Sequence, residues 1–378
     1  MALKSSLLIL VLNSGSSSVK YSLFKGNKEI LKGIKENIGL KTGEKNHQIA
    51  LEKIFQEIKE SGLIKDFKDI KLIGHRVVHG GEIFRKTTLI NKKNLKELKK
   101  ISHLAPLHNP YNVLGIELCL KLFPWAKNYA VFDTEFYSSL KEKAFLYALP
   151  YEFYEKYKIK RYGFHGISHQ YVFSLANKIL KTKIKKAITC HLGAGSSITA
   201  IENGQPIDTS MGFTPNEGLI METRCGNIDA IIPLYLIKNK YFNEIQLEEI
   251  LNKKSGFLGI CGLRDFREIL KSNEKRAKLC YQMYLRSVVK YIGAYIALLK
   301  GVEAIVFTGG IGEGSAKFRE DVLKHFLYLG VKIDKKKNYN QETIISTKDS
   351  KIKVLVIHTN EALMIAQKIS NLLATKNK

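Results

Sequence analysis

An apolar run, a glycine turn and a second extended run stand near the middle of the chain. Residues 187–190 have the composition of a buried strand, residues 193–195 interrupt it with two glycines, and residues 198–200 resume an extended pattern. A turn with almost no side chains offers its backbone N–H groups to a ligand, and it can close on a phosphate oxygen. The pattern predicts a strand–turn–strand unit that is able to bind phosphate.

A second copy of this pattern lies 180 residues earlier in the chain. Residues 8–12 are apolar, residues 13–18 form a serine-rich turn, and residues 19–24 alternate between apolar and polar side chains. When the two segments are superposed, Gly15 falls on Gly195 and a Ser-Ser pair follows each glycine. Two similar units half a chain apart predict a duplicated domain, with two turns facing one polyphosphate.

The rest of the pattern adds further helices and strands. Residues 50–61 and 280–299 have the spacing of amphipathic helices, and residues 304–308 and 354–357 have the composition of strands. The longer helix is compatible with the core or with an interface between subunits, and the sequence does not separate these. We expect lysine-rich turns and helices over residues 26–69 and find no chemistry there.

The composition indicates a globular chain of two domains. It has 378 residues, of which 45% are hydrophobic, and it lacks a long Pro/Gly/Ser linker. The longest early apolar run, residues 7–12, is too short for a membrane span and lacks the layout of a signal peptide. The five cysteines are scattered, with no CxxC pair, which favours reduced thiols over a zinc site. We therefore expect a cytoplasmic protein that is not associated with a membrane.

The net charge of +26 changes this picture little. Such a charge is compatible with nucleic-acid binding, which a salt-sensitive gel shift would test. Only nine of the 61 basic residues are arginine, the lysines are spread along the chain, and no nucleic-acid motif is present. We expect a solvated basic surface that attracts anionic substrates, and no nucleic-acid partner.

Three segments of the first half carry candidate chemistry. Arg76 lies in an apolar strand that ends in paired glycines, where a guanidinium needs an anionic partner. That partner could be a structural carboxylate such as Glu82 or a bound oxyanion, and the segment alone leaves both open. His108 lies in a proline-flanked elbow between two helices, and Asp133 follows a strand at the end that tends to face a ligand.

Twelve segments, taken together, resemble acetate kinases in order and in spacing. They cover nearly the whole chain, from about Leu8 to beyond Glu361, and so many ordered matches make the resemblance highly specific. The segments are SGSSSVKYSLF, GHRVVHGGE, LAPLHNP, VFDT, YALPYEFYEKY, RYGFHGISH, TCHLGAGSSITA, TSMGFTP, TRCGNID, KKSGFLG, VFTGGIGE and HTNEA.

The resemblance implies the duplicated two-domain α/β fold of acetate and sugar kinases, heat-shock ATPases and actin, with mixed sheets flanked by helices. The N-terminal domain, residues 1–137 with 362–378, would bind acyl and phosphate groups. Residues 138–361 would bind the nucleotide and form a homodimer.

The implied reaction is reversible transfer of the γ-phosphoryl group of ATP to acetate, giving acetyl phosphate and ADP. Arg76 would hold the acetate carboxylate, whereas His165 and Arg224 would stabilise the transferring phosphoryl group. Asp133 would orient Arg76 or a metal-bound water, because a carboxylate needs no base to act as nucleophile. The remaining acetate positions are His108 and an apolar methyl pocket of Val78, Leu107, Phe164 and Pro215. A pocket of this kind separates acids that differ by one methylene by only ~1–3 kcal/mol, so propionate should react less well than acetate.

The resemblance also implies a nucleotide and a metal. Mg²⁺, or Mn²⁺ in its place, would be held by Asn13 and Glu361, which offer the oxygen ligands that magnesium prefers. ATP or ADP would bind as co-substrate. The positions implied for the nucleotide are Ser16, Ser18, Lys20, His191, Leu192, Gly193, Ala194, Gly195, Asp265, Phe266, Arg267, Gly310, Ile311, Gly312, Glu313 and Gly314.

Four positions depart from the family pattern. Ala194 and Gly314 replace asparagines, Glu222 replaces a glycine two residues before Arg224, and Tyr137 replaces a histidine. These changes keep two alternatives open. One is a propionate or butyrate kinase, and the other is a catalytically weakened regulator that binds nucleotide without turnover. We expect catalysis to survive, because the residues implied for it are all present.

Overall fold

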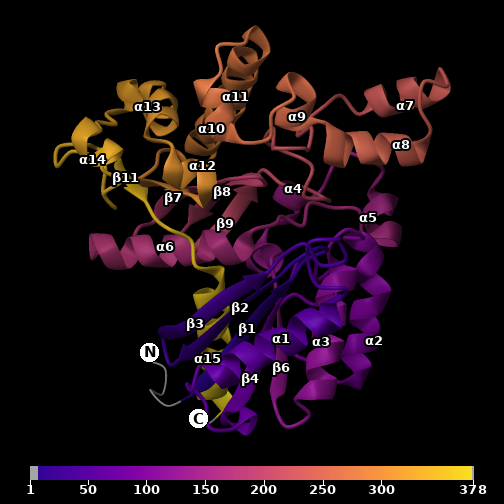
Figure 1. Ribbon diagram of the computed structural model, residues 1–378. Helices are drawn as coiled ribbons and strands as arrows, with labels where there is room; N and C mark the ends of the chain where they lie inside the picture. Colours follow the sequence, from indigo (N-terminus) through magenta and orange to yellow (C-terminus); the bar gives the residue numbers. More distant parts are fainter. Residues whose placement is uncertain (1–6, 377–378) are drawn as a thin grey trace. The chain divides into compact units, whose positions relative to one another are not determined.

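The computed structural model describes residues 7–376, and the chain divides into two compact units. The first unit contains the residues up to Ser138 and those from Asn360 onward, and the second contains residues 139–359. In Figure 1 each unit consists of a sheet with helices packed around it. The chain passes between the units twice, after Ser138 and after Thr359.

The first unit is built on a six-stranded sheet with the strand order β3-β2-β1-β4-β6-β5. Its elements are β1 (Leu8–Ser14), β2 (Val19–Lys25), β3 (Lys28–Lys35), α1 (His47–Glu60), the 3₁₀ helix η1 (Phe67–Asp69), β4 (Ile70–Val77), β5 (Thr88–Leu89), α2 (Lys92–Lys100), the 3₁₀ helix η2 (Ile101–Leu104), α3 (Asn109–Leu122), β6 (Lys127–Phe132) and α15 (Glu361–Lys376). The 3₁₀ helix η3 (Glu135–Ser139) spans the end of this unit.

The second unit is built on a five-stranded sheet with the order β11-β10-β7-β8-β9. Its elements are α4 (Glu142–Phe145), α5 (Tyr151–Tyr157), α6 (Gly166–Leu180), β7 (Lys186–Leu192), β8 (Ser196–Glu202), β9 (Gln205–Thr209), α7 (Ile231–Lys238), α8 (Glu244–Glu249), the π-helix η4 (Ile250–Lys254), α9 (Gly256–Cys261), α10 (Phe266–Lys271), α11 (Lys275–Leu299), β10 (Ala304–Thr308), α12 (Gly309–Gly314), α13 (Ala316–Lys324), the 3₁₀ helix η5 (Leu327–Leu329), α14 (Lys335–Tyr339) and β11 (Lys353–Val356).

The two sheets confirm the predicted duplication. In each, a central strand pairs antiparallel with the strand that follows it, which pairs antiparallel with the next. On its other side the same central strand pairs with the first of two successive parallel strands, β4 and β6 in the first unit and β10 and β11 in the second. The added edge strand β5 is the difference between the two sheets. The predicted α/β class with mixed sheets is therefore correct.

The two glycine turns differ in length. β1 continues to Ser14, which pairs with Val19, so the first turn has four residues. β7 ends at Leu192, which pairs with Ser196, so the second turn has three. The Ser-Ser pairs that align in the sequence consequently lie in the turn in one unit and in strand β8 in the other.

Strand β3 corrects one expectation from the sequence. Residues 28–35 lie in the stretch expected to form turns and helices, but they form an antiparallel partner of β2. Its lysines keep the strand exposed or half-buried at the sheet edge, which weakens the apolar alternation. Charged side chains on an edge strand are a common protection against pairing with other chains.

Helices cover both faces of the first sheet because side chains alternate along each strand. Leu10 and Leu12 belong to the apolar cluster that includes α1. Val11 points to the other face, where a Cβ added to Gly74 would lie 2.6 Å from Ile365 of α15. This position has no room for a side chain, so Gly74 allows α15 to pack directly on the sheet.

Helix α11 packs with one face on the second sheet. Its buried residues recur every three or four positions: Ala277, Cys280, Tyr284, Val288, Ile292, Tyr295 and Leu299. Leu279, Met283 and Leu298 remain exposed on the rest of the helix. The predicted amphipathic helix is confirmed and extends at its N-terminus to Lys275, with its apolar stripe in the core.

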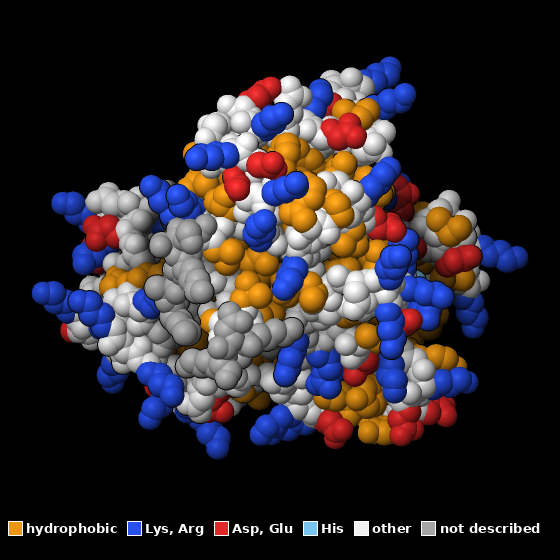
Figure 2. All heavy atoms as spheres, turned by 90° about the horizontal axis from the view of Figure 1, so that it is seen from below, with side chains coloured by type: hydrophobic (Ala, Val, Ile, Leu, Met, Phe, Trp, Pro, Cys, Tyr) orange, Lys and Arg blue, Asp and Glu red, His pale blue; other side chains and the backbone are white. Residues whose placement is uncertain are grey.

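Basic residues are spread over the face of the molecule that Figure 2 displays. On the face that Figure 2 displays, lysine and arginine side chains are dispersed among acidic, polar and apolar ones.

Between residues 7 and 376, no helix combines the length and the apolar character needed to cross a bilayer. The five cysteines are free thiols, of which Cys119, Cys190 and Cys280 are buried.

Candidate functional site

Arg76 lies near the end of β4 and is held by two carboxylates of the first unit. Its Nε and Nη2 donate to the two oxygens of Asp133 at 3.0 and 2.8 Å, and its Nη1 lies 2.8 Å from Oε2 of Glu361. Burial by itself would lower the pKa of Arg76, but the carboxylates of Asp133 and Glu361 raise it above its usual value. Burial also raises the pKa of Asp133, and Arg76 acts against that rise. A guanidinium has five N–H groups, so this arrangement fixes its plane and leaves donors for a ligand.

Helix α3 supports the segment that follows Arg76. Asn109 accepts from the His79 N–H at 3.0 Å and donates to the His79 carbonyl at 2.9 Å. One turn later, Asn112 accepts from the Val78 N–H at 3.1 Å and donates to the Ser14 carbonyl at 2.6 Å. Both asparagines are buried. The helix therefore ties the loop after β4 to the end of β1.

The two residues implied for magnesium both belong to the first unit. Asn13 is half-buried near the end of β1, and Glu361 is the first residue of α15, which packs on β1. Within residues 7–376, no group of three or more His, Cys, Asp or Glu side chains is placed to hold a metal. An amide and a carboxylate suit magnesium, which commonly binds few protein oxygens and keeps several waters.

Two imidazoles stack beside the glycine turn of the second unit. His165 precedes α6, His191 lies in β7, and their ring centroids are 4.3 Å apart. His165 adopts a φ of 58°, an uncommon conformation for a residue other than glycine. Such backbone strain is found preferentially at functional sites. His191 Nδ1 lies 2.8 Å from the Ser168 hydroxyl, which also bonds to Thr359.

Arg224 lies close to the same turn. A Cβ added to Gly195 would lie 3.3 Å from His165 Nε2 and 3.6 Å from Arg224 Nη1, so both side chains border this glycine. Arg224 Nη1 donates to the Pro215 carbonyl at 3.2 Å. Burial lowers the pKa of Arg224, and the nearby Glu222 acts against that shift.

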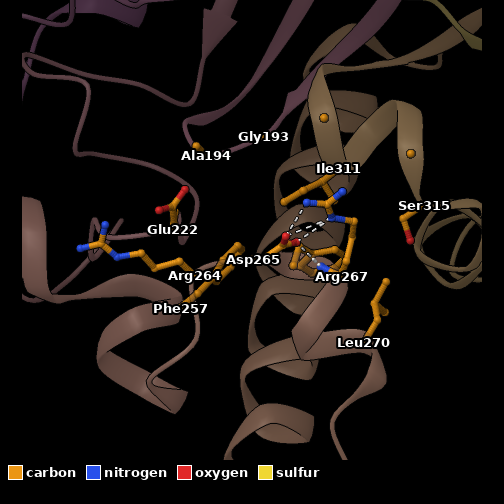
Figure 3. A pocket seen from close by; sticks show the side chains of 13 residues that line it. Gly193, Ala194, Glu222, Phe257, Arg264, Asp265, Arg267, Leu270, Ile311 and Ser315 are labelled. Carbon is orange, nitrogen blue, oxygen red and sulfur yellow. Dashed lines mark hydrogen bonds and ion pairs between the residues drawn. The ribbon is translucent and has the colours of Figure 1, made fainter. Parts of the chain in front are cut away.

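A cavity of about 540 Å³ lies in the second unit, at the side of the same turn (Figure 3). In Figure 3, Glu222 points toward Ala194 on one side, and Asp265 and Arg267 face each other in the middle. Arg267 Nη2 donates to Asp265 at 2.6 Å, and this pair lowers the pKa of Asp265 to about 2. The lining residues are Gly193, Ala194, Glu222, Phe257, Arg264, Asp265, Phe266, Arg267, Leu270, Gly310, Ile311, Gly314 and Ser315.

The cavity brings together many of the positions implied for nucleotide. Those that line it are Gly193, Ala194, Asp265, Phe266, Arg267, Gly310, Ile311 and Gly314. Leu192 does not line it and places its side chain in the apolar core. Ser16, Ser18 and Lys20 lie at the other glycine turn, in the first unit, where the Gly15 N–H donates to the Ser18 carbonyl at 2.7 Å.

The glycine run after β10 forms a short helix, α12. Gly309 starts it with a φ of 78°, and a Cβ there would lie 2.7 Å from the Leu192 carbonyl oxygen. The Glu313 carboxylate accepts from Gly309 N–H at 2.8 Å and from Thr359 N–H at 3.1 Å. Glu313 thus directs its charge into the protein and stabilises the start of its own helix.

A buried arginine holds the other end of α12. Arg319 is fully buried, and its Nη1 donates to the carbonyls of Gly312 and Glu313 at 2.9 and 2.7 Å. Its Nε and Nη2 donate to the side chain and the carbonyl of Asn338, both at 2.8 Å. Burial lowers the pKa of Arg319 to about 10. These bonds satisfy helix carbonyls that have no partner within α12.

The residues implied for acetate divide between the units. Arg76, Val78, Leu107 and His108 belong to the first unit, with Leu107 partly exposed. Phe164, which is buried, and Pro215 belong to the second. Of the three residues implied for catalysis, Asp133 lies in the first unit beside Arg76, whereas His165 and Arg224 lie in the second beside Gly195.

The sequence did not identify several residues that support the site. Asn109 and Asn112 hold the loop after β4, Arg319 holds α12, and Ser197 joins His169 to His165. The sequence does contain a signal for Asn109 and Asn112. Polar side chains on the buried face of a helix, as at Asn109 and Asn112, need partners and often support a site.

Comparison with known proteins shows high similarity over the whole chain. Residues 8–367 match the model of the acetokinase family. The chain belongs to the acetokinase family. An acetate kinase of Thermotoga maritima is 47% identical over 390 residues, which cover 95% of this chain and 97% of that protein.

Solved acetokinase structures are similar as well. A propionate kinase of Francisella tularensis is 40% identical with a TM-score of 0.90, covering 96% of this chain and 98% of the other. Porphyromonas gingivalis acetate kinase is 39% identical with a TM-score of 0.90, covering 97% and 100%. The fold is therefore the actin-like fold of the acetokinase structures, as the sequence predicted.

Proposed function

We propose a residue-level account of how this chain acts as an acetate kinase. The chain is an ATP:acetate phosphotransferase, which converts acetate and ATP to acetyl phosphate and ADP and catalyses the reverse. Family membership over residues 8–367 carries this conclusion. In this proposal the N-terminal domain, residues 1–137 with 362–378, binds the acyl and phosphate groups, and residues 138–361 bind the nucleotide.

Arg76 binds the carboxylate of acetate in this proposal. Asp133 and Glu361 orient its guanidinium, and the remaining N–H groups can donate to the two acetate oxygens. Asp133 acts through Arg76 and not as a base, because the carboxylate nucleophile has no proton to lose. Val78, Leu107, Phe164 and Pro215 surround the methyl group, and His108 completes the acetate site.

His165 and Arg224 stabilise the phosphoryl group during a direct in-line transfer. Their side chains border Gly195, whose lack of a side chain lets an anion approach the backbone of the turn. Donors aimed at the place where negative charge is redistributed contribute most to the rate of such transfers. The nucleotide occupies the cavity beside this turn, where Asp265, Phe266 and Arg267 face Gly310 and Ile311.

Asn13 and Glu361 hold the metal, which we assign as Mg²⁺ with Mn²⁺ as a substitute. When bound, the ion supplies charge neutralisation for the triphosphate. Glu361 has a second task, because one of its oxygens already pairs with Arg76. Lys20, Ser16 and Ser18 add a positive charge and hydroxyl donors for the phosphates.

The protein forms a homodimer through the second unit in this proposal. Helix α7 has the sequence IIPLYLIK, and none of its residues is buried within one chain. Apolar residues near it are also exposed, including Tyr241 and Ile245. A helix that is apolar on every side requires burial, and a second copy of the chain would provide it.

We also propose a cytoplasmic location, in line with five free thiols.

Trapping of acyl phosphates with hydroxylamine tests the function directly. The purified protein is incubated with Mg-ATP and acetate, propionate or butyrate, and the hydroxamates are quantified. We expect acetate to give the highest kcat/KM and propionate a lower value. A preference for propionate would assign the chain to the alternative activity. Binding of ATP without turnover of any acid would contradict the enzyme assignment and favour a regulator.

A further inference from the structure

A chain of hydrogen bonds runs from the core of the second sheet to His165. His169 lies one turn into α6, and its Nδ1 is 2.7 Å from the Thr189 hydroxyl of β7. Its Nε2 is 2.7 Å from the Ser197 hydroxyl of β8. His169, Thr189 and Ser197 are all fully buried. Neither strand residue is a neighbour of His169 in the sequence, so the fold creates this chain.

The Ser197 hydroxyl joins two imidazoles. Its oxygen lies 2.7 Å from His169 Nε2 and 3.0 Å from His165 Nδ1. A hydroxyl has one proton to donate and can accept from the other side. If Ser197 donates to His165, it accepts from His169. If it donates to His169 instead, it accepts from His165. The protonation of the two rings is therefore coupled through one oxygen.

One arginine and two further imidazoles lie around His165, and the Glu222 carboxylate lies close to that arginine. Arg224 Nη1 borders the same glycine as His165 Nε2, His191 stacks on the ring, and His169 lies behind Ser197. A second cation next to the Arg224 guanidinium would be repelled. Burial lowers the pKa of His169 well below its usual range, and His191 adds to this shift. His169 therefore stays neutral and can only donate through one ring nitrogen and accept through the other.

We propose that His169 and Ser197 are positioning residues that fix His165 as the tautomer protonated at Nε2. Thr189 donates to His169 Nδ1, His169 Nε2 donates to Ser197, and Ser197 donates to His165 Nδ1. His165 then presents an N–H from Nε2 on the side of Gly195. This inference rests on the assignment of His165 to the phosphoryl group under the proposed function. It explains how a neutral imidazole can donate to an anion without first taking up a proton.

Ser197→Ala and His169→Gln test the inference through kinetics. Both variants should lower kcat about tenfold to a hundredfold, the usual effect of losing a buried hydrogen bond at a site. The KM values for ATP and acetate should change less than about twofold, because neither residue is assigned to a substrate. Wild-type kcat should be flat from about pH 6 to 8, whereas kcat of Ser197→Ala should vary with pH once the tautomer is no longer fixed.

The nitrogen chemical shifts of His165 provide a readout that a purely structural role would not move. In protein labelled with ¹⁵N at histidine, and with the signals assigned by His165→Gln, the wild type should show a protonated Nε2 and an unprotonated Nδ1. Ser197→Ala should show a mixture of tautomers. Thr199→Ala is the matched control, because Thr199 is equally buried on the same strand as Ser197 but bonds to Thr209. It should leave the His165 signals unchanged.

A double-mutant cycle separates this inference from the assignment of His165 itself. If Ser197 acts through His165, Ser197→Ala should lower kcat little further in a His165→Gln background. Equal effects in both backgrounds, or a wild-type His165 with Nδ1 protonated, would overturn the inference. Unchanged kcat in His165→Gln alone would instead overturn the role of His165 in the proposed function. Urea unfolding of each variant identifies any that fail to fold, and His169→Asn then replaces His169→Gln.

Discussion

Arg76 is held between two carboxylates, and that arrangement decides what the side chain can still bind. Asp133 accepts from Nε and Nη2 of the guanidinium, and Glu361 pairs with Nη1. The sequence left open whether Arg76 pairs with a structural carboxylate or with an oxyanion. The structure provides structural carboxylates, Asp133 and Glu361 in place of the suggested Glu82, and the five donors of the guanidinium leave the second possibility available.

Arg76→Lys should raise the KM for acetate about tenfold to a hundredfold. Lysine keeps the charge but loses the planar fork, and a hydrogen bond to a charged group contributes ~1.5–3 kcal/mol. The KM for ATP should remain within about twofold of the wild type. Steady-state kinetics with each substrate varied in turn measures both values. An equal rise in both KM values would contradict a specific contact with acetate.

His75→Gln should reduce the loss of stability in weak acid. His75 is buried in β4, its Nε2 lies 2.8 Å from the Asn128 amide oxygen, and burial lowers its pKa to about 4. Below about pH 6.5 the unfolded chain takes up a proton that the folded protein does not, so the free energy of unfolding falls as the pH falls toward 4.

Urea unfolding at pH 7 and 5.5 checks this prediction. The variant should lose about 1 kcal/mol less between these two pH values than the wild type. His103→Gln, an exposed histidine, should lose as much as the wild type and serves as the control. The same loss in His75→Gln as in the wild type would show that His75 is not the group responsible.

Helix α12 is an element that depends on side chains at both of its ends. Its sequence, GGIGEG, has little tendency to form a helix, because glycine loses the most backbone freedom on ordering. Glu313 accepts from the Gly309 N–H at its start, and Arg319 donates to the carbonyls of Gly312 and Glu313 at its end. Glycines allow the backbone to approach a ligand, and these two side chains supply the order.

Arg319→Met should weaken ATP binding and destabilise the fold. It leaves the Gly312 and Glu313 carbonyls without their donor, and losing several buried hydrogen bonds to a charged group costs about 3 kcal/mol. The KM for ATP should rise severalfold while that for acetate changes little. Urea unfolding and steady-state kinetics measure the two effects, with the exposed Arg276→Met as control. Lower stability with an unchanged KM for ATP would contradict the role assigned to α12.

On the scale of the whole molecule, two sheets of the same core strand order carry different sites. The first places Arg76 and Asp133 at the ends of parallel strands, and the second places the glycine turn and α12 around the cavity. The second unit also carries the exposed apolar helix α7. Under the proposed function, the duplicated topology would provide one framework for each of the two substrates of the reaction.

If the protein is the homodimer proposed above, Leu234→Glu should convert it to a monomer. Leu234 lies in α7 and is 59% exposed in a single chain, and a carboxylate there would be desolvated in the interface. Multi-angle light scattering should give twice the chain mass for the wild type and the mass of one chain for the variant. Leu327→Glu, at a leucine of 56% exposure in η5, should remain dimeric. A wild-type protein with the mass of one chain would contradict the proposal.

The sequence by itself determined most of the strands, the helices α1 and α11, and the duplication. The hairpin of β7 and β8 and the helix α11 follow from hydrophobic periodicity, which neighbouring residues express locally. Family motifs also named many residues that line the cavity, because the backbone of glycine turns is set by the residues in them. Edge strand β3 was not predicted, because its lysines obscure the alternation of apolar and polar side chains that is typical of a strand.

Only the tertiary structure decided which distant side chains meet. Arg76 and Glu361 are 285 positions apart, yet they pair because α15 returns to the first sheet. His169 reaches Ser197 because α6 packs on β7, next to the strand β8. Contacts of this kind depend on strand order and helix packing, which no local pattern contains. The physical reason is that burial creates the need for a partner, whereas the fold alone selects which partner is within reach.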